Sequence, residues 1–350
     1  MGLRNDDSGG RRGGLRDRKV GRQATRRRHR LRRGAGMAVL AALVATWAPV
    51  MAPAARATDP INVPWSSVLP GWTTQHIASS ENDCVSGRPA CVRITLHELN
   101  RVLERTGRSC DHNAIFALSY LRMTQSYWWS REIPGYYEDV PFANHQDAVF
   151  AKYYTDAFTA WRRGAKDQVP PAWRVAFEAA DNKEVTAMGD LLLGMNAHIN
   201  RDLPFVLAGV GLVAPDGSSR KRDFDQVEDF LARATGPMLA ESARRFDPSM
   251  DTMAEPTGLL YTLLFQMISL GREKAWRNAE ALVTAPTQAA RDRVEARIEA
   301  DAHATALVLK GLTTATFLNP PAKRASYCSV NHAATAPREY PFGTPRPYGA

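Results

Sequence analysis

The sequence predicts an all-α protein built as a single bundle-like domain of several helices. From Arg93 onward, apolar residues recur at the three- and four-residue spacing of amphipathic helices, and the strict alternation typical of strands is scarce. Prolines and glycines divide this pattern into segments of helical length. An irregular N-terminal segment and an extended, proline-rich C-terminal tail are expected to flank the domain.

Residues 1–57 have the composition of an export signal. They carry 14 Lys and Arg residues against 3 acidic residues, a net charge of +11, and they include an apolar run at 37–52. A small-x-small cleavage pattern follows at 55–57. The apolar run is short and contains Pro49, so a retained membrane anchor is the weaker alternative. We therefore expect an exported protein, secreted or associated with the cell envelope, whose mature chain begins at Thr58 and has no transmembrane span.

The arginine-rich part of this signal leaves two export routes open, the general secretory route and the twin-arginine route. Outside the signal the charge is nearly balanced, with 31 basic against 33 acidic residues. Generic nucleic-acid binding needs clustered cations that displace counterions from phosphates, and the mature chain offers no such excess. Nucleic acid is therefore not an expected partner.

All four cysteines lie beyond the export signal, at Cys84, Cys91, Cys110 and Cys328. An even number of cysteines in an exported chain favours two disulfides. Of the three possible pairings, the one that joins Cys84 to Cys91 and Cys110 to Cys328 asks least of the fold. No Cys-x-x-Cys pair is present, which argues against a zinc site made of cysteines.

The elements follow in order from the periodicity and its breaks. Segment 58–92 is expected to be irregular, segment 93–318 to form the helical domain, and segment 319–350 to lie extended on the domain surface. The first helix opens with a capping box at 95–98 and ends before Gly107. Further helices are predicted at 111–130, 146–165, 171–181, 184–203, 224–246, 257–284 and 287–311, most of them bounded by prolines.

The segment DLLLGMNAHINRDLP at 190–204 is the most informative part of the sequence. In a helix, His198 and Asp202 share one side, next to an apolar stripe. The stripe consists of Val185, Met188, Leu192, Met195 and Ile199. Such a pair can place an imidazole nitrogen and a carboxylate on one metal ion, or it can form a plain hydrogen bond. Asn196 and Asn200 border the other side of the stripe, which favours a polar pocket nearby.

The signature GMNAHINRDLP resembles that of a family of uncharacterised exported actinobacterial proteins, over most of the mature chain. A more distant similarity is to the zinc-dependent bacterial phospholipase C and the related fungal single-strand nucleases, which are all-helical and hold three zinc ions. Their Leu-Gly pair shortly before His-x-x-x-Asp is matched by Leu193 and Gly194 with His198 and Asp202. Their tyrosine-rich loop that ends in Phe-Ala-x-His is similar to residues 134–145.

This second resemblance implies a site for zinc or another divalent metal. His97 and His145 match ligand positions of those enzymes, and Glu228 falls at the end of a later His-x-x-x-Glu motif. Asp147 is a further candidate carboxylate. The implied ligands are His97, His145, Asp147, His198, Asp202 and Glu228, with Asn196 and Asn200 as donors that orient them.

The sequence departs from the zinc enzymes at three ligand positions. Their N-terminal Trp is missing if the mature chain begins at Thr58, Ala208 replaces one histidine, and Phe224 replaces another. These departures leave ligands for a mono- or dinuclear site. Around zinc, such ligands would lower the pKa of a bound water and supply hydroxide for attack on a phosphoester.

Two functions are therefore expected. The first is a metal-dependent hydrolase of the phosphoesterase kind, acting on a small-molecule or lipid phosphoester. The alternative is a non-catalytic exported binding or envelope-associated protein, in which His198 and Asp202 form a structural hydrogen bond.

Overall fold

The structure is a computed structural model that describes residues 84, 86–254, 259–315 and 320–334. These residues fall within one compact unit. Between them they contain only isolated β-bridges and no strand, which confirms the all-α prediction. None of the helices in these ranges combines the length and the apolar character needed to cross a membrane. The predicted export signal and most of segment 58–92 lie outside the described residues.

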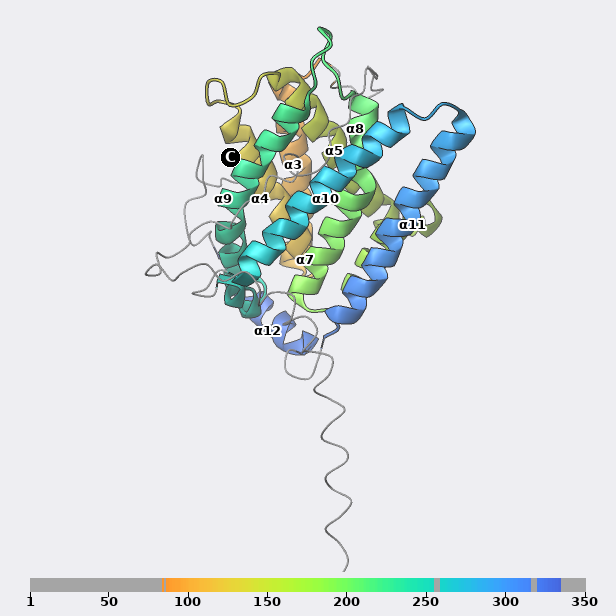
Figure 1. The fold of residues 1–350 in the computed structure, drawn as a ribbon. Helices are drawn as coiled ribbons and strands as arrows, with labels where there is room; N and C mark the ends of the chain where they lie inside the picture. The colour runs from red at the N-terminus through yellow and green to blue at the C-terminus, as the bar shows by residue number, and fades with distance from the viewer. Residues whose placement is uncertain (1–83, 85, 255–258, 316–319, 335–350) are drawn as a thin grey trace, which may run out of the picture. The chain divides into compact units, whose positions relative to one another are not determined.

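The described chain is a succession of helices (Figure 1). The α-helices are α3 (Pro89–Arg108), α4 (Ala114–Ser130), α5 (Val140–Arg162), α6 (Pro171–Asp181), α7 (Ala187–Met195), α8 (Leu203–Val210), α9 (Lys221–Arg245), α10 (Leu259–Val283), α11 (Gln288–Leu312) and α12 (Pro321–Asn331). Two 3₁₀-helices, η1 (Lys166–Gln168) and η3 (Pro248–Ala254), and a π-helix, η2 (Asn196–Asp202), complete the set. The predicted helix at 146–165 begins earlier, because the Asp139 carboxylate accepts from the backbone N–H of Phe142 and caps α5 there.

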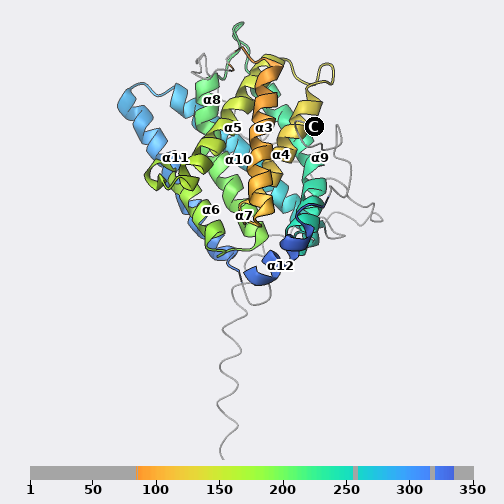
Figure 2. The ribbon, with the colours of Figure 1, turned by 180° about the vertical axis from the view of Figure 1, so that it is seen from behind.

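Helices α7, η2 and α8 follow one another without a break and form what we call the central rod, residues 187–210. Helices α4, α5, α6, α10 and α11 all pack against it. In Figure 1 the hairpin of α10 and α11 covers the rod on the near side, and Figure 2 shows α3 and α6 on the opposite side. The rod is therefore surrounded, and most of its polar side chains, including His198 and Asp202, are buried.

The middle of the central rod is π-helical, and Pro204 gives a physical reason for it. A proline inside a helix lacks an N–H and its ring clashes with the carbonyl four residues earlier, here that of Asn200. The wider turns of a π-helix relieve that clash, and short π-segments are frequent at functional sites. This segment, Asn196–Asp202, contains both His198 and Asp202.

Gly194 allows α4 to approach the central rod closely. A Cβ atom at this position would lie 2.4 Å from the Phe116 ring, which leaves no room for any other residue. The Phe116 ring centroid consequently lies 5.8 Å from that of His198. The Leu-Gly pair that resembles the zinc enzymes thus has a packing role here.

The structure contains both disulfides in the favoured pairing, Cys84 with Cys91 and Cys110 with Cys328. The first closes a turn in which Gly87 has a φ of +60°. A Cβ atom at this position would lie 1.9 Å from the carbonyl oxygen of Pro141 and would collide with it. Only glycine therefore allows the turn to pack against the start of α5.

The prediction of a wholly extended C-terminal tail was wrong, because α12 lies within it. Pro320 and Pro321 occupy the N-cap and first position of this helix, where the missing N–H of proline costs nothing. The disulfide between Cys110 and Cys328 ties α12 to the end of α3. The remaining prolines of the tail lie outside the described residues.

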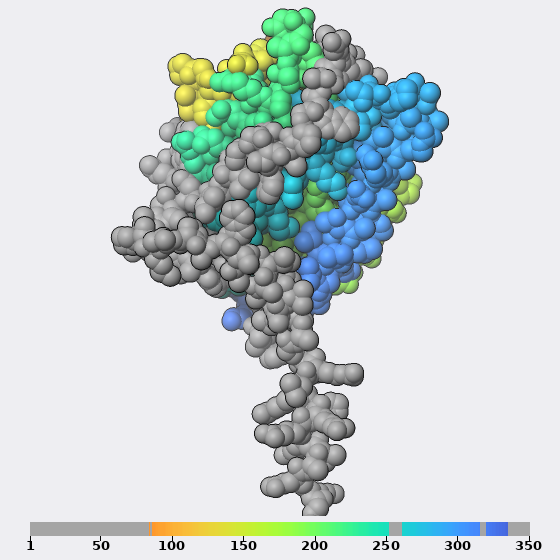
Figure 3. Space-filling view, in the orientation of Figure 1, coloured from red at the N-terminus to blue at the C-terminus, as the bar shows by residue number. Residues whose placement is uncertain are grey.

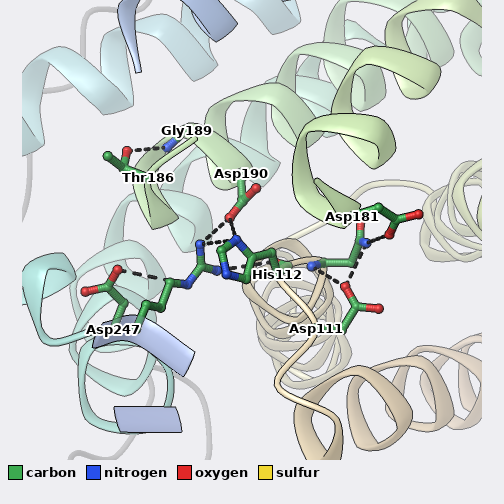
Figure 4. A network of polar contacts seen from close by, with 9 residues as sticks. Asp111, His112, Asp181, Thr186, Gly189, Asp190 and Asp247 are labelled. Atoms are coloured by element: carbon green, nitrogen blue, oxygen red, sulfur yellow. Dashed lines mark hydrogen bonds and ion pairs between the residues drawn. The ribbon is translucent and has the colours of Figure 1, made fainter. Parts of the chain in front are cut away.

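A buried polar network fixes α12 against the domain (Figure 4). The Arg324 guanidinium donates to Asp190 Oδ2 and lies 3.0 Å from Nδ1 of His112, while Asp247 Oδ2 is 3.9 Å away. Burial and the charge of Arg324 lower the pKa of His112 to about 3, so its neutral Nδ1 accepts the hydrogen bond. Arg324 therefore anchors α12 to the beginning of α4 and to α7.

Candidate functional site

A cavity of about 130 Å³ lies between α4, α5, the central rod, α9 and α10. Most of its walls are apolar, and they include six aromatic residues: Phe116, Tyr120, Tyr127, Phe142, Phe150 and Phe230. Polar side chains from all five of these elements also line it. Pockets for small molecules commonly combine an apolar lining with a small number of polar groups.

His198 lines this cavity and is held from behind by Asp202. The His198 Nδ1 lies 3.2 Å from Oδ2 of Asp202, a residue without exposed surface. Asp202 also accepts from the Trp173 Nε1 at 2.8 Å and from Arg201 at 3.0 Å. Burial lowers the pKa of His198, an effect that Asp202 only partly offsets. His198 is therefore neutral, with its proton on Nδ1 and a free acceptor at Nε2.

The position of the His198 ring is set by aromatic neighbours. It stacks on Phe150 with 3.5 Å between centroids and 4° between planes, and Tyr120 meets it edge-on at 4.4 Å. The Nε2 atom is buried and has no hydrogen-bond partner. An acceptor is thus held rigidly at the cavity wall.

Asp147 contributes a second unpartnered group to the same cavity. It lies on α5 one turn before Phe150, so the two side chains share a helix face. Its Oδ2 has no hydrogen-bond partner, and burial raises the pKa of the carboxyl to about 8. At neutral pH this carboxyl is mainly protonated and can donate a hydrogen bond.

Two hydroxyl groups from α4 complete the polar part of the cavity. Tyr120 and Thr124 are one helical turn apart, both line the cavity, and neither hydroxyl has a hydrogen-bond partner. Burial and the nearby carboxyls of Asp147 and Asp202 raise the pKa of Tyr120 well above its usual value. Buried polar atoms are normally paired, so four such atoms at one cavity mark it as a candidate binding site.

Charged residues at the α9 and α10 side of the cavity are already engaged with protein groups. Glu228 accepts from the Ser269 hydroxyl at 2.6 Å and lies 3.6 Å from the Nε atom of Arg272. Asp223 accepts from the backbone N–H groups of Glu138 and Asp139 at 2.8 and 2.6 Å. Glu228 therefore supports Arg272, a residue of the cavity wall, and does not itself face the cavity.

The predicted metal ligands are only partly brought together. His97 is exposed on α3, away from the buried His198. His145 precedes Asp147 by two residues, a rotation of about 200° on a helix, and so points away from the cavity. Its pKa is lowered by burial and by the charge of Arg220. Only His198, Asp202 and Asp147 lie near one another.

These residues do not fit a zinc site. In the part of the chain that the structure describes, no group of three His, Cys, Asp or Glu side chains could hold a metal ion. A catalytic zinc needs three protein ligands, whereas Asp202 here already accepts from His198, Trp173 and Arg201. The cationic Arg201 also makes this carboxylate a poor position for a metal ion.

Asn196 and Asn200 have a structural role instead of orienting metal ligands. Asn200 donates to the side-chain oxygen of Asn196 at 3.0 Å, and Asn196 donates to the Ala302 carbonyl of α11 at 2.9 Å.

The burial expected for the apolar stripe beside His198 and Asp202 is also revised. Only half-buried are four of its five residues, Met188, Leu192, Met195 and Ile199. His198 and Asp202 are fully buried instead, because helices pack around the whole rod and cover its polar side as well.

Several residues of the cavity were not foreseen from the sequence. Tyr120 and Thr124 lie four residues apart in one helix and so share a face, and this spacing is the signal that could have identified them. Phe150 and Arg272 have no such signal, because their role depends on how α5 and α10 pack against the central rod. Tyr127 of α4 also lines the cavity.

Comparisons with known proteins give one match. The model of a family described as being of unknown function, DUF5995, matches residues 92–311, which span the chain from α3 to the end of α11. No curated protein and no solved structure matches, so the resemblance to zinc-dependent phospholipase C has no support from these comparisons. The match covers well over half of the chain and all the cavity residues, and the chain therefore belongs to the DUF5995 family.

Proposed function

We propose that this protein is an exported binding protein that holds one small, mainly apolar molecule in the cavity beside His198. The observation that carries the proposal is the convergence of four unpartnered buried polar atoms on one otherwise apolar cavity. Each unpaired buried group costs about 1–3 kcal/mol, and a ligand with matching groups would recover that cost.

The size of the cavity limits the ligand. An engineered apolar cavity of about 150 Å³ in another protein binds benzene, and this cavity of about 130 Å³ is comparable. A molecule with one six-membered ring, or an aliphatic compound of similar volume, is therefore the largest expected ligand. Phospholipid molecules are much too large to enter as a whole.

The arrangement of donors favours binding over metal-dependent hydrolysis. Asp202 and its partners hold His198 as a neutral acceptor, and among the described residues no third metal ligand stands next to it. Two disulfides and the strongly basic N-terminal segment support export of the protein. The second of the two functions expected from the sequence is thus the better supported one.

The test is a thermal unfolding screen of the exported protein with benzene, toluene, phenol, indole and cyclohexane. Any compound that binds the folded state raises the Tm in proportion to RT ln(1 + [L]/Kd). Ala143, which lines the cavity, is replaced in the variant Ala143→Met to fill the space. The control variant Ala289→Met changes an exposed alanine of α11.

We expect at least one ring compound to stabilise the protein and the Ala289→Met variant equally, and to have little effect on Ala143→Met. If no compound raises the Tm, or if the rise is unchanged in Ala143→Met, the cavity is not the binding site. Elemental analysis provides a second arm. Stoichiometric zinc that is lost in His198→Ala would contradict the proposal and restore the metal-dependent alternative.

A further inference from the structure

The hydrogen-bonding atoms of the cavity determine which polar group a ligand must carry. From them we infer that the ligand is a small hydroxylated ring compound of the phenol class, whose hydroxyl donates to Nε2 of His198. This inference rests on the proposed binding function and specifies its ligand.

The first step is the fixed direction of the hydrogen bond at His198. The Nδ1 atom faces Asp202, which also receives donors from Trp173 and Arg201 and so remains an acceptor. Nδ1 must then carry the ring proton, and Nε2 has only a lone pair to offer. A ligand has to donate a hydrogen at this point, which ketones, ethers and plain hydrocarbons cannot do.

The second step concerns the other three unpartnered groups. The hydroxyls of Tyr120 and Thr124 and the Asp147 carboxyl can each donate a hydrogen bond to a ligand oxygen. The rings of Tyr120 and His198 are in contact, with 4.4 Å between centroids. A hydroxyl group donates one hydrogen bond and accepts up to two, which matches one fixed acceptor with donors around it.

The third step is the exclusion of charged ligands. A carboxylate would enter the same cavity as Asp223, while the cation of the wall, Arg272, is already paired with Glu228. An ammonium group would meet the Arg272 guanidinium in the same cavity. A neutral hydroxyl avoids both conflicts and costs less to desolvate than either ion.

The fourth step is the shape of the walls. Phe150 and His198 stack in parallel, and Phe116 meets the His198 ring edge-on with 81° between planes. Tyr127 and Phe230 form a further aromatic pair of the lining. Flat aromatic surfaces favour a planar ring through stacked or edge-to-face contacts.

The experiment measures the dissociation constants of phenol, p-cresol, anisole, toluene and benzylamine by titration calorimetry with the exported protein. We expect phenol or p-cresol to bind at least about tenfold more tightly than anisole, a difference of about 1.4 kcal/mol. In the same samples, the ¹⁵N chemical shift of His198 Nε2 should move on addition of phenol and stay unchanged with toluene.

Two shape-conserving variants keep the test independent of His198 substitutions, which can disturb folding. Tyr120→Phe and Thr124→Val each remove one hydroxyl from the wall and should reduce the preference for phenol over anisole. Thr106→Val removes a buried hydroxyl of α3 that already donates to the Val102 carbonyl and does not line the cavity, and it should leave that preference unchanged.

The outcomes separate the inference from the function on which it rests. If anisole or toluene binds as tightly as phenol, the hydroxyl inference is wrong while the cavity remains a binding site. If benzylamine binds best, the ligand is an organic cation and the inference is also wrong. If none of the five compounds binds, both the inference and the proposed function are overturned.

Discussion

At the scale of single residues, Asp147 has the most unusual environment of the cavity. Its carboxyl is buried, and Oδ2 has no hydrogen-bonding partner. Burial raises the pKa of this carboxyl from its ordinary value of 3.8 to about 8 in the folded state. Between these two values the folded state keeps a proton that the unfolded state has released. The free energy of unfolding must therefore fall as the pH rises from about 4 to about 8.

The variant Asp147→Asn tests this linkage. Asparagine carries no charge at any pH, so the variant should lose less stability than the wild type between pH 5 and pH 8, and it should be the more stable protein at pH 8. Urea unfolding at both pH values measures the difference. Asp156→Asn, at an exposed position of the same helix, is the control. An identical pH dependence in wild type and Asp147→Asn would show that this carboxyl is ionised throughout.

A second prediction for a single residue concerns Asp202, because its carboxylate accepts hydrogen bonds from three side chains. Replacing it by alanine removes the protein acceptor of Trp173 and His198 and one of the two carboxylate partners of Arg201, which keeps Glu299. Removal of one partner from a buried charged pair costs about 3–5 kcal/mol. We expect Asp202→Ala to lower the free energy of unfolding by this amount.

The matched control for Asp202 is Asp156→Ala, which breaks an exposed pair with Lys152 and should cost no more than about 1 kcal/mol. Both values come from chemical denaturation under the same conditions. Equal losses in the two variants would mean that the hydrogen bonds of Asp202 contribute little to the folded state.

At the scale of elements, the sequence pattern was sufficient for most helices and failed where a local contact overrides it. Periodicity with proline breaks gives α6 over its full observed range, 171–181. The start of α5 was missed because Asp139 caps it in front of a proline, and α12 was missed because its prolines were read as breakers. Both errors come from prolines that stand in the first turn, where they are compatible with a helix.

The candidate site was harder to predict than the elements that form it. His198 and Asp202 share a helix, so their spacing alone brings them together. His145 was assigned to a loop, and only its actual place within α5 shows that it and Asp147 face different sides. Arg272 and Phe150 reach the cavity through the packing of α10 and α5, which no local pattern encodes.

The prediction at the scale of elements concerns the disulfide that ties α12 to the domain. In the chain-entropy model, a disulfide stabilises more when it closes a longer loop. The Cys110–Cys328 bond spans 218 residues and the Cys84–Cys91 bond spans 7. For these lengths the model gives upper values of about 5 and about 2.5 kcal/mol.

We therefore expect Cys110→Ser with Cys328→Ser to destabilise the protein more than Cys84→Ser with Cys91→Ser, as measured by urea unfolding. Protease cleavage should also appear first near α12 in the former variant, where Arg324 would be the main remaining anchor. If the two double variants lose equal stability, the polar network around Arg324 holds α12 without help from its disulfide.

At the scale of the whole molecule, charge is divided unevenly along the chain. The first 57 residues carry +11, whereas the remainder carries −2. The four cysteines of the remainder are all paired, and none of the described cysteines is free. The apolar side chains of Leu263, Met267 and Leu270 of α10 are about half exposed. Figure 3 shows parts of α10 and α11 at the molecular surface. The basic N-terminal segment and the paired cysteines together support the proposal that the protein is exported.

This division of charge predicts how the protein is processed. Expressed with its own N-terminal segment in an actinobacterial host, the chain should be recovered outside the cytoplasm with Thr58 as its first residue and with no free thiols. Intact mass before and after alkylation measures both properties.

Replacing Arg26 and Arg27 by lysine distinguishes the two export routes, because a twin-arginine signal depends on the arginine pair and a general secretory signal needs only positive charge. Loss of export in this variant would mean that the protein crosses the membrane already folded, with the cavity formed and its ligand able to bind before export. A full-length cytoplasmic chain with four free thiols would contradict export altogether.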